Sequence, residues 1–226
     1  RHIVTLENPI EFLHRDQRCS ITQRDVGTDT TDFKTGLRAA LRQDPDVILI
    51  GEMRDKETID IALKASETGH LVISTLHTQN AVKTISRIIS VFDPSEQEMI
   101  RIRLAENLQG VVSQRLLPRK DGNGRVPAVE VMVVTGTIRD CILDPERVDE
   151  IPDFIQEGRQ HYGSQTFDQH LMDLVNQGRL DFQVAKAAAT NPSDFDLKMN
   201  VLGEGGKRPG VGRRGPSEDV SRLFGN

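Results

Sequence analysis

The sequence is poor in the residues that mark several classes of protein. Its 226 residues include no Trp, one Tyr and two Cys, and aromatic residues make up only 4% of the chain. Cys19 and Cys141 lie far apart without a C-x-x-C spacing, which suggests neither a disulfide framework nor a zinc site. No apolar run approaches the roughly 18 residues that span a membrane, and no secretory leader is visible. We therefore expect a cytoplasmic protein without direct membrane insertion.

A net positive charge and a phosphate-binding loop are also lacking. The net charge of −5 gives no global attraction to nucleic acid or anionic lipid, so we expect no nucleic-acid partner. Nowhere does the chain contain G-x-x-x-x-G-K-S/T, the loop whose backbone amides surround nucleotide phosphates. The Gly-rich stretch "GEGGKRPG" (203–210) has neither this spacing nor a preceding strand. A phosphate loop is therefore absent from the printed sequence.

Apolar runs alternate with helical periodicity over the first 134 residues. Helical periodicity between and after the first strands predicts helices at residues 30–45, 55–69, 80–92 and 94–109. Pro94 is a favourable first residue for the last of these helices. Asp-Gly and Asn-Gly pairs in "RKDGNG" predict a turn between the last two strands. Such alternation predicts an α/β fold whose sheet is parallel with mixed edges. The predicted strands are 2–6, 19–23, 46–50, 70–76, 111–118 and 126–134.

The character of the chain changes after Thr135. Only short helices are predicted there, at about 135–143, 149–160, 164–177 and 182–189. From Gly203 to Pro216 there are six Gly, two Pro and four Lys or Arg residues, a composition that cannot bury enough surface to offset its ordering entropy. We therefore divide the chain into a core (1–134), a helical subdomain (135–200) and a disordered tail (201–226).

Charged residues directly follow an apolar run in "DPDVILIGEMRD" (44–55). Val47 to Ile50 suit a strand that is buried on both faces of a parallel sheet. The carboxyl end of such a strand opens onto the crevice in which α/β folds bind ligands. Glu52 would there hold a metal ion or orient a water molecule. The alternative is a solvated turn with an ion pair between Glu52 and Arg54.

Polar groups follow two more predicted strands. Glu7 and Glu11 flank Asn8-Pro9 after the first strand, and Pro9 forbids a regular helix there. His77 follows the strand that His70 begins. The seven residues from one histidine to the other span roughly 23 Å, so they cannot share a metal ion. A single histidine at a strand end is often structural, but three strands that send Glu, Glu and His to one edge suit nucleotide hydrolysis.

Three stretches, in this order, resemble motifs of the secretion and pilus motor ATPases, most closely the PilT-type retraction ATPases. "VTLENPIEF" looks like the acidic Asp box, "PDVILIGEMRD" like the Walker B segment and "GHLVISTLHT" like the His box. The likeness covers about residues 1–190. It implies a RecA-like P-loop NTPase core with a C-terminal helical appendage. The Walker A loop would lie upstream of Arg1, so we expect a fragment that is inactive without that loop.

The resemblance implies a role for each matching residue. Glu11 would activate the attacking water, Glu52 would arrange Mg²⁺ and water, and Glu7 would be a supporting acid. His77 and His70 match the His-box pair, and His77 is the better placed to meet the γ-phosphate or a neighbouring subunit.

Arg54 and Arg87 are candidates for contacts with phosphate or with a neighbouring subunit. Each arginine also has a plain interpretation as a surface residue, which we favour slightly for Arg87 because it lies inside a predicted helix.

The implied function is a hexameric motor that couples ATP hydrolysis to type IV pilus retraction in twitching motility. Its cofactors would be ATP and Mg²⁺. Its partners would be five further copies and a platform protein of the inner membrane, which places it on the cytoplasmic face near the pilus base. A nucleic-acid-translocating ATPase of the same fold would need a basic stripe or stacking aromatics, and the chain has neither.

Two departures leave other assignments open. Asn8 stands where the family usually has Asp, which favours an accessory or non-hydrolysing retraction subunit. "TIRDCILD" (137–144) keeps only Ile138, Arg139 and Ile142 of the retraction motif, which leaves a sister motor open. Extension and type II secretion ATPases commonly carry a four-cysteine zinc element, and Cys141 is the only cysteine in that region.

Overall fold

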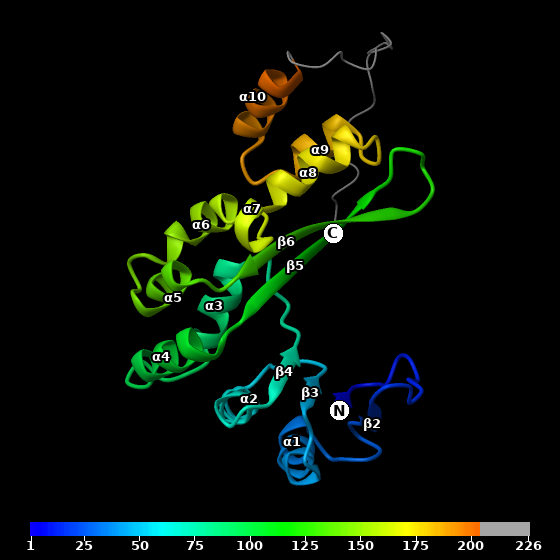
Figure 1. The fold of residues 1–226 in the computed structure, drawn as a ribbon, viewed down its shortest axis with the longest axis vertical. Helices are drawn as coiled ribbons and strands as arrows, with labels where there is room; N and C mark the ends of the chain where they lie inside the picture. The colour runs from blue at the N-terminus through cyan, green and yellow to red at the C-terminus, as the bar shows by residue number, and fades with distance from the viewer. Residues whose placement is uncertain (204–226) are drawn as a thin grey trace.

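A sheet of four parallel strands forms the amino-terminal part of the molecule (Figure 1). The computed structural model describes residues 1–203. Apolar, β-branched runs favour strands, and the predicted α/β fold with a parallel sheet is confirmed. The strands lie side by side in the order β2 (Ser20–Asp25), β1 (His2–Glu7), β3 (Val47–Ile50) and β4 (Leu71–Ser74).

The register brings the carboxyl ends of these strands to one edge. Leu6 of β1 lies opposite Ile50 of β3, which lies opposite Ser74 of β4. Glu7 lies opposite Asp25 of β2. The polar residues that follow each strand therefore emerge along the same edge of the sheet.

Two helices cover one face of the sheet. They are α1 (Phe33–Ala40), which a short 3-10 turn extends to Gln43, and α2 (Lys56–Glu67). Asp55 caps α2 as predicted, because its side chain accepts the N–H of Thr58 at 2.9 Å. The helices bury Leu6, Ile48 and Ile50 together with apolar residues of their own.

The other face of the sheet stays open within residues 1–203. Leu71 and Ile73 of β4 point to that face and keep 51% and 46% of their surface exposed. β4 is also an edge strand of the described sheet. Parallel sheets are ordinarily covered on both faces, so this sheet is half covered in the described part of the chain.

The predicted mixed sheet is wrong. β5 (Gly110–Pro118) and β6 (Arg125–Val133) pair antiparallel as a separate two-stranded hairpin and do not join β4. The turn predicted from "RKDGNG" does connect them, with Gly122 and Gly124 at positive φ. The two strands pair with each other along their facing edges, and buried residues of both strands pack on helices. An alternating pattern fits such a ribbon as well as it fits the edge of a larger sheet.

A second core forms among one end of the hairpin, Ile59 and Leu63 of α2, and four further helices. These are α3 (Ala81–Ser90), α4 (Gln97–Asn107), α5 (Gly136–Leu143) and α6 (Ile151–Glu157). α4 begins later than predicted, because Pro94 lies in the turn before it. Buried members of this core include Ile85, Ile88, Leu104, Met132 and Ile142.

Among the helices of residues 1–203, none combines the length and the apolar character needed to cross a membrane.

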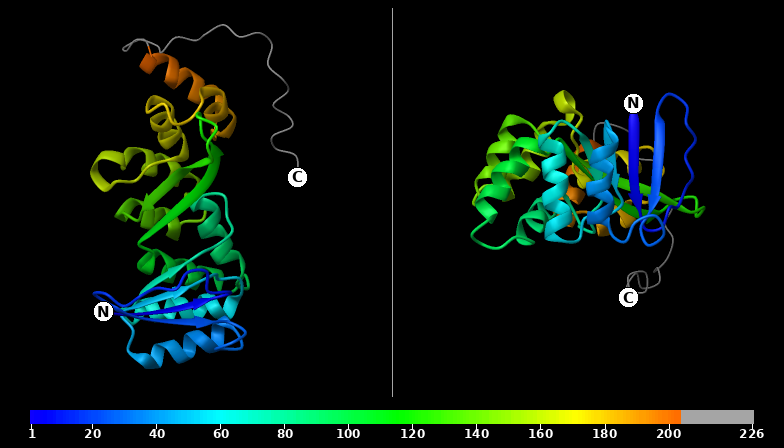
Figure 2. Two further views of the ribbon diagram at one scale, coloured as in Figure 1. Left: turned by 90° about the vertical axis from the view of Figure 1, so that its right-hand side faces the viewer. Right: turned by 90° about the horizontal axis from the view of Figure 1, so that it is seen from below.

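A third core lies at the other end of the hairpin. Phe167 and Leu171 of α8 pack there against Leu117, Val126 and Ala128 of the hairpin. Figure 2 shows the parallel sheet at one end of an elongated molecule and α10 at the other. The sequence did not predict α10, and most of the predicted tail (201–226) lies outside the described residues. α7 (Arg159–Tyr162) follows α6, and the helices of this end are α8 (Phe167–Asn176), α9 (Phe182–Ala188) and α10 (Pro192–Gly203).

Candidate functional site

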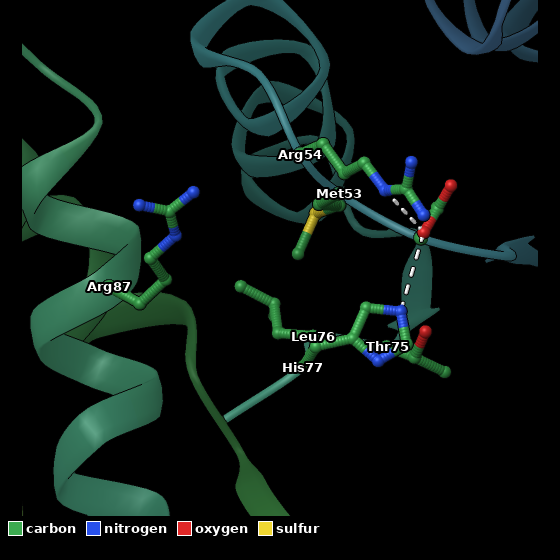
Figure 3. Close-up of a pocket in the computed structure, with 7 residues that line it drawn as sticks. Met53, Arg54, Thr75, Leu76, His77 and Arg87 are labelled. Atoms are coloured by element: carbon green, nitrogen blue, oxygen red, sulfur yellow. Dashed lines mark ion pairs between the residues drawn. The ribbon is translucent and has the colours of Figure 1, made fainter. Parts of the chain in front are cut away.

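A crevice of about 300 Å³ opens at the carboxyl ends of β3 and β4. Ligands of open α/β sheets bind at this edge. In Figure 3, Arg87 reaches the crevice from α3 on one side, and Arg54 and His77 lie on the other. The lining residues are Glu52, Met53, Arg54, Thr75, Leu76, His77 and Arg87.

Backbone contacts fix the two chain segments that leave the sheet here. The N–H of Gly51 donates to the carbonyl of Leu6 at 2.7 Å. A Cβ atom at position 51 would lie 3.1 Å from that oxygen, so the glycine permits a close approach of the two strands. The N–H of Met53 donates to the carbonyl of Thr75 at 3.2 Å, and the hydroxyl of Thr75 donates to the carbonyl of Gly51 at 2.5 Å.

Glu52 lies between two nitrogen donors. Its Oε2 is 2.6 Å from Nε of Arg54 and 3.6 Å from Nε2 of His77. The Glu52 side chain is 20% exposed, whereas those of Arg54 and His77 are 72% and 81% exposed. Glu52 and Arg54 therefore form the ion pair of the alternative interpretation, and both also line the crevice.

Arg87 faces this group from the opposite wall. It is exposed on α3, and within residues 1–203 it forms no ion pair. The crevice therefore carries two guanidinium groups and one imidazole against a single carboxylate. Guanidinium groups match the oxygens of phosphate and carboxylate ligands. This balance suits an anionic ligand that also needs one acid beside it.

The two acids predicted from the first strand lie apart from the crevice lining. Glu7 ends β1, where its Oε1 accepts from the hydroxyl of Thr5 at 2.5 Å and from Nε2 of Gln23 at 2.9 Å. Glu11 is exposed on the loop after β1 and makes no hydrogen bond within residues 1–203. Glu7 thus stands on the functional edge one strand from Glu52, and Glu11 stands on a loop beyond it.

Sequence reasoning missed Asp25. It ends β2 opposite Glu7, and its Oδ2 accepts the N–H of Ile10 at 3.0 Å. Asp25 therefore attaches the loop that carries Glu11 to the sheet edge. The predicted strand stopped at residue 23, two residues short, which left this acid in an unassigned stretch.

His70 is not brought to the crevice. It precedes β4 at the amino edge of the sheet, and its Nδ1 lies 2.9 Å from the carbonyl of Ala65 and 3.1 Å from the hydroxyl of Thr68. These are groups at the end of α2. His70 and His77 stand at opposite ends of β4, as the spacing predicted, so a cofactor contact by His70 has no support in this arrangement.

The donor set limits how a metal ion would bind. No group of three or more His, Cys, Asp or Glu side chains in residues 1–203 is arranged to hold one. Glu52 is the one carboxylate in the crevice lining. Mg²⁺ usually keeps several waters and takes one or two protein carboxylates together with phosphate oxygens. The crevice fits Mg²⁺ held through water by Glu52 beside a phosphorylated ligand.

Comparisons with known proteins show the family to which this chain is similar. The family model described as "Type II/IV secretion system protein" matches residues 1–186. The chain is 48% identical to the type IV pilus retraction ATPase PilT of Pseudomonas aeruginosa over 194 residues, 86% of this chain and 56% of that protein. It is 47% identical to a twitching motility protein of Neisseria gonorrhoeae over 196 residues, 87% of this chain and 52% of that one.

A solved structure agrees with the sequence relatives. The crystal structure of the pilus retraction motor PilT with bound ADP superposes with a TM-score of 0.76 at 43% identity, and the match covers 87% of this chain and 55% of that one. The chain therefore spans about half the length of the relatives it matches.

Proposed function

The chain belongs to the type II/IV secretion system protein family, and we propose on this basis that it is part of an ATPase motor that drives type IV pilus retraction. Its α/β core is similar to the RecA-like core of the PilT structure. The observation that carries the proposal is the placement of Glu52 beside Arg54 and His77 at the carboxyl edge of the parallel sheet.

In this proposal the four charged or ionisable residues of the crevice act on bound ATP. Glu52 would orient water and hold Mg²⁺ through water, and the ion would offset phosphate charge. His77 meets the γ-phosphate or a neighbouring subunit. Arg54 and Arg87 donate to phosphate oxygens from the two walls. Binding of an anion between the arginines would draw Arg54 from Oε2 of Glu52 and leave that carboxylate free for water.

Glu11 remains the proposed base for the attacking water, with Glu7 as a supporting acid. The exposed loop that carries Glu11 is attached to the sheet through Asp25 and Ile10. A loop of this kind moves more easily than the strands that flank it. We propose that the loop brings Glu11 against the water when nucleotide fills the crevice.

Other parts of the working motor are proposed to lie outside the printed sequence. The phosphate loop would come from elsewhere in the protein, since the chain spans about half the length of its relatives. We propose that the chain alone does not hydrolyse ATP. The motor would be a homohexamer on the cytoplasmic face of the inner membrane, where it engages the platform protein at the pilus base.

A second candidate function follows from Asn8. It stands exposed between Glu7 and Pro9, where the resembling motif usually has an acid, and an amide carries no negative charge. If that charge is needed for hydrolysis, the protein is an accessory, non-hydrolysing retraction subunit. Replacement Asn8→Asp would then create or raise hydrolysis, whereas a working motor would change little.

The decisive experiment is the steady-state ATPase rate of the full-length gene product. We expect a rate well above background that falls by about 100-fold or more in Glu52→Gln and Glu11→Gln, because each removes an acid that acts on water. The matched control is Glu98→Gln, an exposed glutamate on α4, which should keep the wild-type rate. Wild-type rates in both acid variants would refute the proposed roles, and no hydrolysis by the wild type would favour the accessory subunit.

A further inference from the structure

Glu130 is a buried acid that the proposed hydrolysis does not use. It lies on β6 and is only 8% exposed. Its Oε1 accepts the backbone N–H of Ala81, the first residue of α3, at 2.7 Å. Ser113, its partner on β5, donates a longer bond of 3.4 Å to the same oxygen. The carboxylate thus joins the hairpin to the start of α3.

Burial of the Glu130 carboxylate costs free energy unless its contact with α3 is made. Burial raises the pKa of the Glu130 carboxyl, because the apolar surroundings disfavour the charged form, and the bonds from Ala81 and Ser113 oppose that rise. The first N–H groups of a helix have no partner inside the helix, and the helix start favours negative charge. The bond therefore gives the Ala81 N–H an acceptor and the buried Glu130 carboxylate a donor.

Ordinary helix capping does not account for this contact. Asn80 already caps α3, since its side chain accepts the N–H of Lys83 at 2.9 Å. Glu130 lies 49 residues away from Ala81 in the sequence. The bond is therefore a long-range connection between two elements, in addition to the local cap.

The two walls of the crevice belong to different cores. Glu52 follows β3, whose apolar residues pack with α1 and α2 in the core beneath the parallel sheet. Arg87 lies on α3, whose apolar residues pack with the hairpin, α4 and α5 in the second core. Met53 packs against both cores, and α2 joins them, because its Ile59 and Leu63 belong to the second core. The distance between the walls thus depends on how α3 is attached on each side.

His77 lies in the segment that crosses from one core to the other. At its start, the carbonyl of Thr75 accepts the N–H of Met53. At its end, Ala81 is bonded to Glu130. We propose that Glu130 is a positioning residue, which holds α3 on the hairpin and so sets where His77 and Arg87 stand relative to Glu52. This inference rests on the proposed function for its catalytic consequence, but not for the contact itself.

Amide hydrogen exchange at single residues of the full-length gene product, measured without nucleotide, tests the contact. In Glu130→Ala we expect the Ala81 amide to exchange about tenfold faster or more, because its acceptor is lost. Glu130→Gln keeps an acceptor oxygen and should stay close to wild type. Asn80→Ala, the matched control, should speed exchange at Lys83 and spare Ala81. Unchanged exchange of Ala81 in Glu130→Ala would overturn the inference.

ATP turnover of the full-length gene product tests the consequence. Positioning predicts that Glu130→Ala lowers kcat about tenfold while KM for ATP stays within about twofold, since misplaced groups lose transition-state contacts. Glu130→Gln should restore kcat, and Asn80→Ala should leave it unchanged. A normal kcat in Glu130→Ala, or an equal loss in Asn80→Ala, would reduce Glu130 to a structural residue and overturn the inference.

Two further outcomes separate the possible failures. If Glu130→Ala does not fold, Glu130→Asp replaces it in both experiments. Aspartate keeps the charge but is one methylene shorter, so it does not reach Ala81. The same changes in exchange and kcat are then expected, and wild-type values would overturn the inference. If the wild type does not hydrolyse ATP, the proposed function fails, while exchange at Ala81 still decides whether Glu130 holds α3.

Discussion

The Nδ1 atom of His170 accepts the backbone N–H of Val129 at 2.9 Å, so an imidazole on α8 is hydrogen-bonded to β6. A ring nitrogen that accepts a hydrogen bond carries no proton, so this imidazole is neutral. Burial lowers the pKa of His170, Arg159 and Arg179 lower it further, and Asp173 opposes them. The contact lies one residue from Glu130, on the same strand.

Stability is therefore expected to fall in mild acid through His170. Its pKa is about 6.5 in the unfolded chain and lower in the folded one. The contribution of His170 to stability is complete above about pH 6.5 and is lost as the pH falls through the folded pKa. Urea unfolding near pH 7.5 and near pH 5.5 should show a larger loss for wild type than for His170→Asn, whose amide oxygen accepts without titrating. Equal losses would contradict this role.

The two crevice arginines should both contribute to nucleotide affinity. In the full-length gene product, Arg54→Gln and Arg87→Gln should each weaken ATP binding about tenfold, because each removes a charge-assisted hydrogen bond. Arg42→Gln, an exposed arginine outside the crevice, serves as the control. Titration with a fluorescent ATP analogue measures the Kd. An affinity that survives the loss of Arg87 would make it a surface arginine, as its helical position first suggested.

Asp25 should restrain the loop that carries Glu11. Asp25→Ala removes the acceptor for the Ile10 N–H, so we expect that amide to exchange about tenfold faster. Asp16→Ala is a matched control at the far end of the loop, where Asp16 accepts the N–H of Ile21 at 2.9 Å. In the full-length gene product, Asp25→Ala should also lower the ATPase rate more than Asp16→Ala does. Equal effects of the two variants would argue against a specific restraint.

Phe167 should be among the most costly residues to truncate. It is 1% exposed in the third core, and the guanidinium carbon of Arg115 lies 3.9 Å from the centre of its ring. Phe167→Ala should lower the free energy of unfolding by about 3–5 kcal/mol, through lost burial and a remaining cavity. Phe12→Ala, whose ring is 74% exposed, should change it by less than about 0.5 kcal/mol. Urea unfolding of both variants makes the comparison, and similar losses would contradict it.

Local sequence pattern was enough to predict the parallel sheet and the edge at which Glu52 and His77 lie. The apolar run before Glu52 predicted β3 as a strand buried on both faces, but only Ile48 and Ile50 on one face are buried. The position of His77 followed from the next strand. The relation between Glu52 and Arg87 was beyond such reasoning, because it depends on how α3 packs on the hairpin. Asp25 was missed because a strand end is poorly defined by sequence.

The hairpin shows most clearly what local sequence pattern cannot predict. Alternation of apolar and other residues in β6 puts Glu130 on the same face as Ala128 and Met132, a signal that sequence reasoning missed, and all three are buried. That alternation identifies an acid on an apolar face, which is a signal for a specific partner. It does not identify Ala81 as the partner, because that contact depends on how α3 packs on the hairpin, 49 residues away in the sequence.

The half-covered sheet bears on how this chain behaves in concentrated solution. Leu71 and Ile73 expose apolar surface on β4, and the outer backbone edge of β4 has no strand partner within residues 1–203. Open edges that carry apolar side chains pair readily with other chains. Prepared alone, the chain is therefore expected to self-associate as its concentration rises, and a lysine in place of Ile73 should improve its solubility without disturbing the crevice.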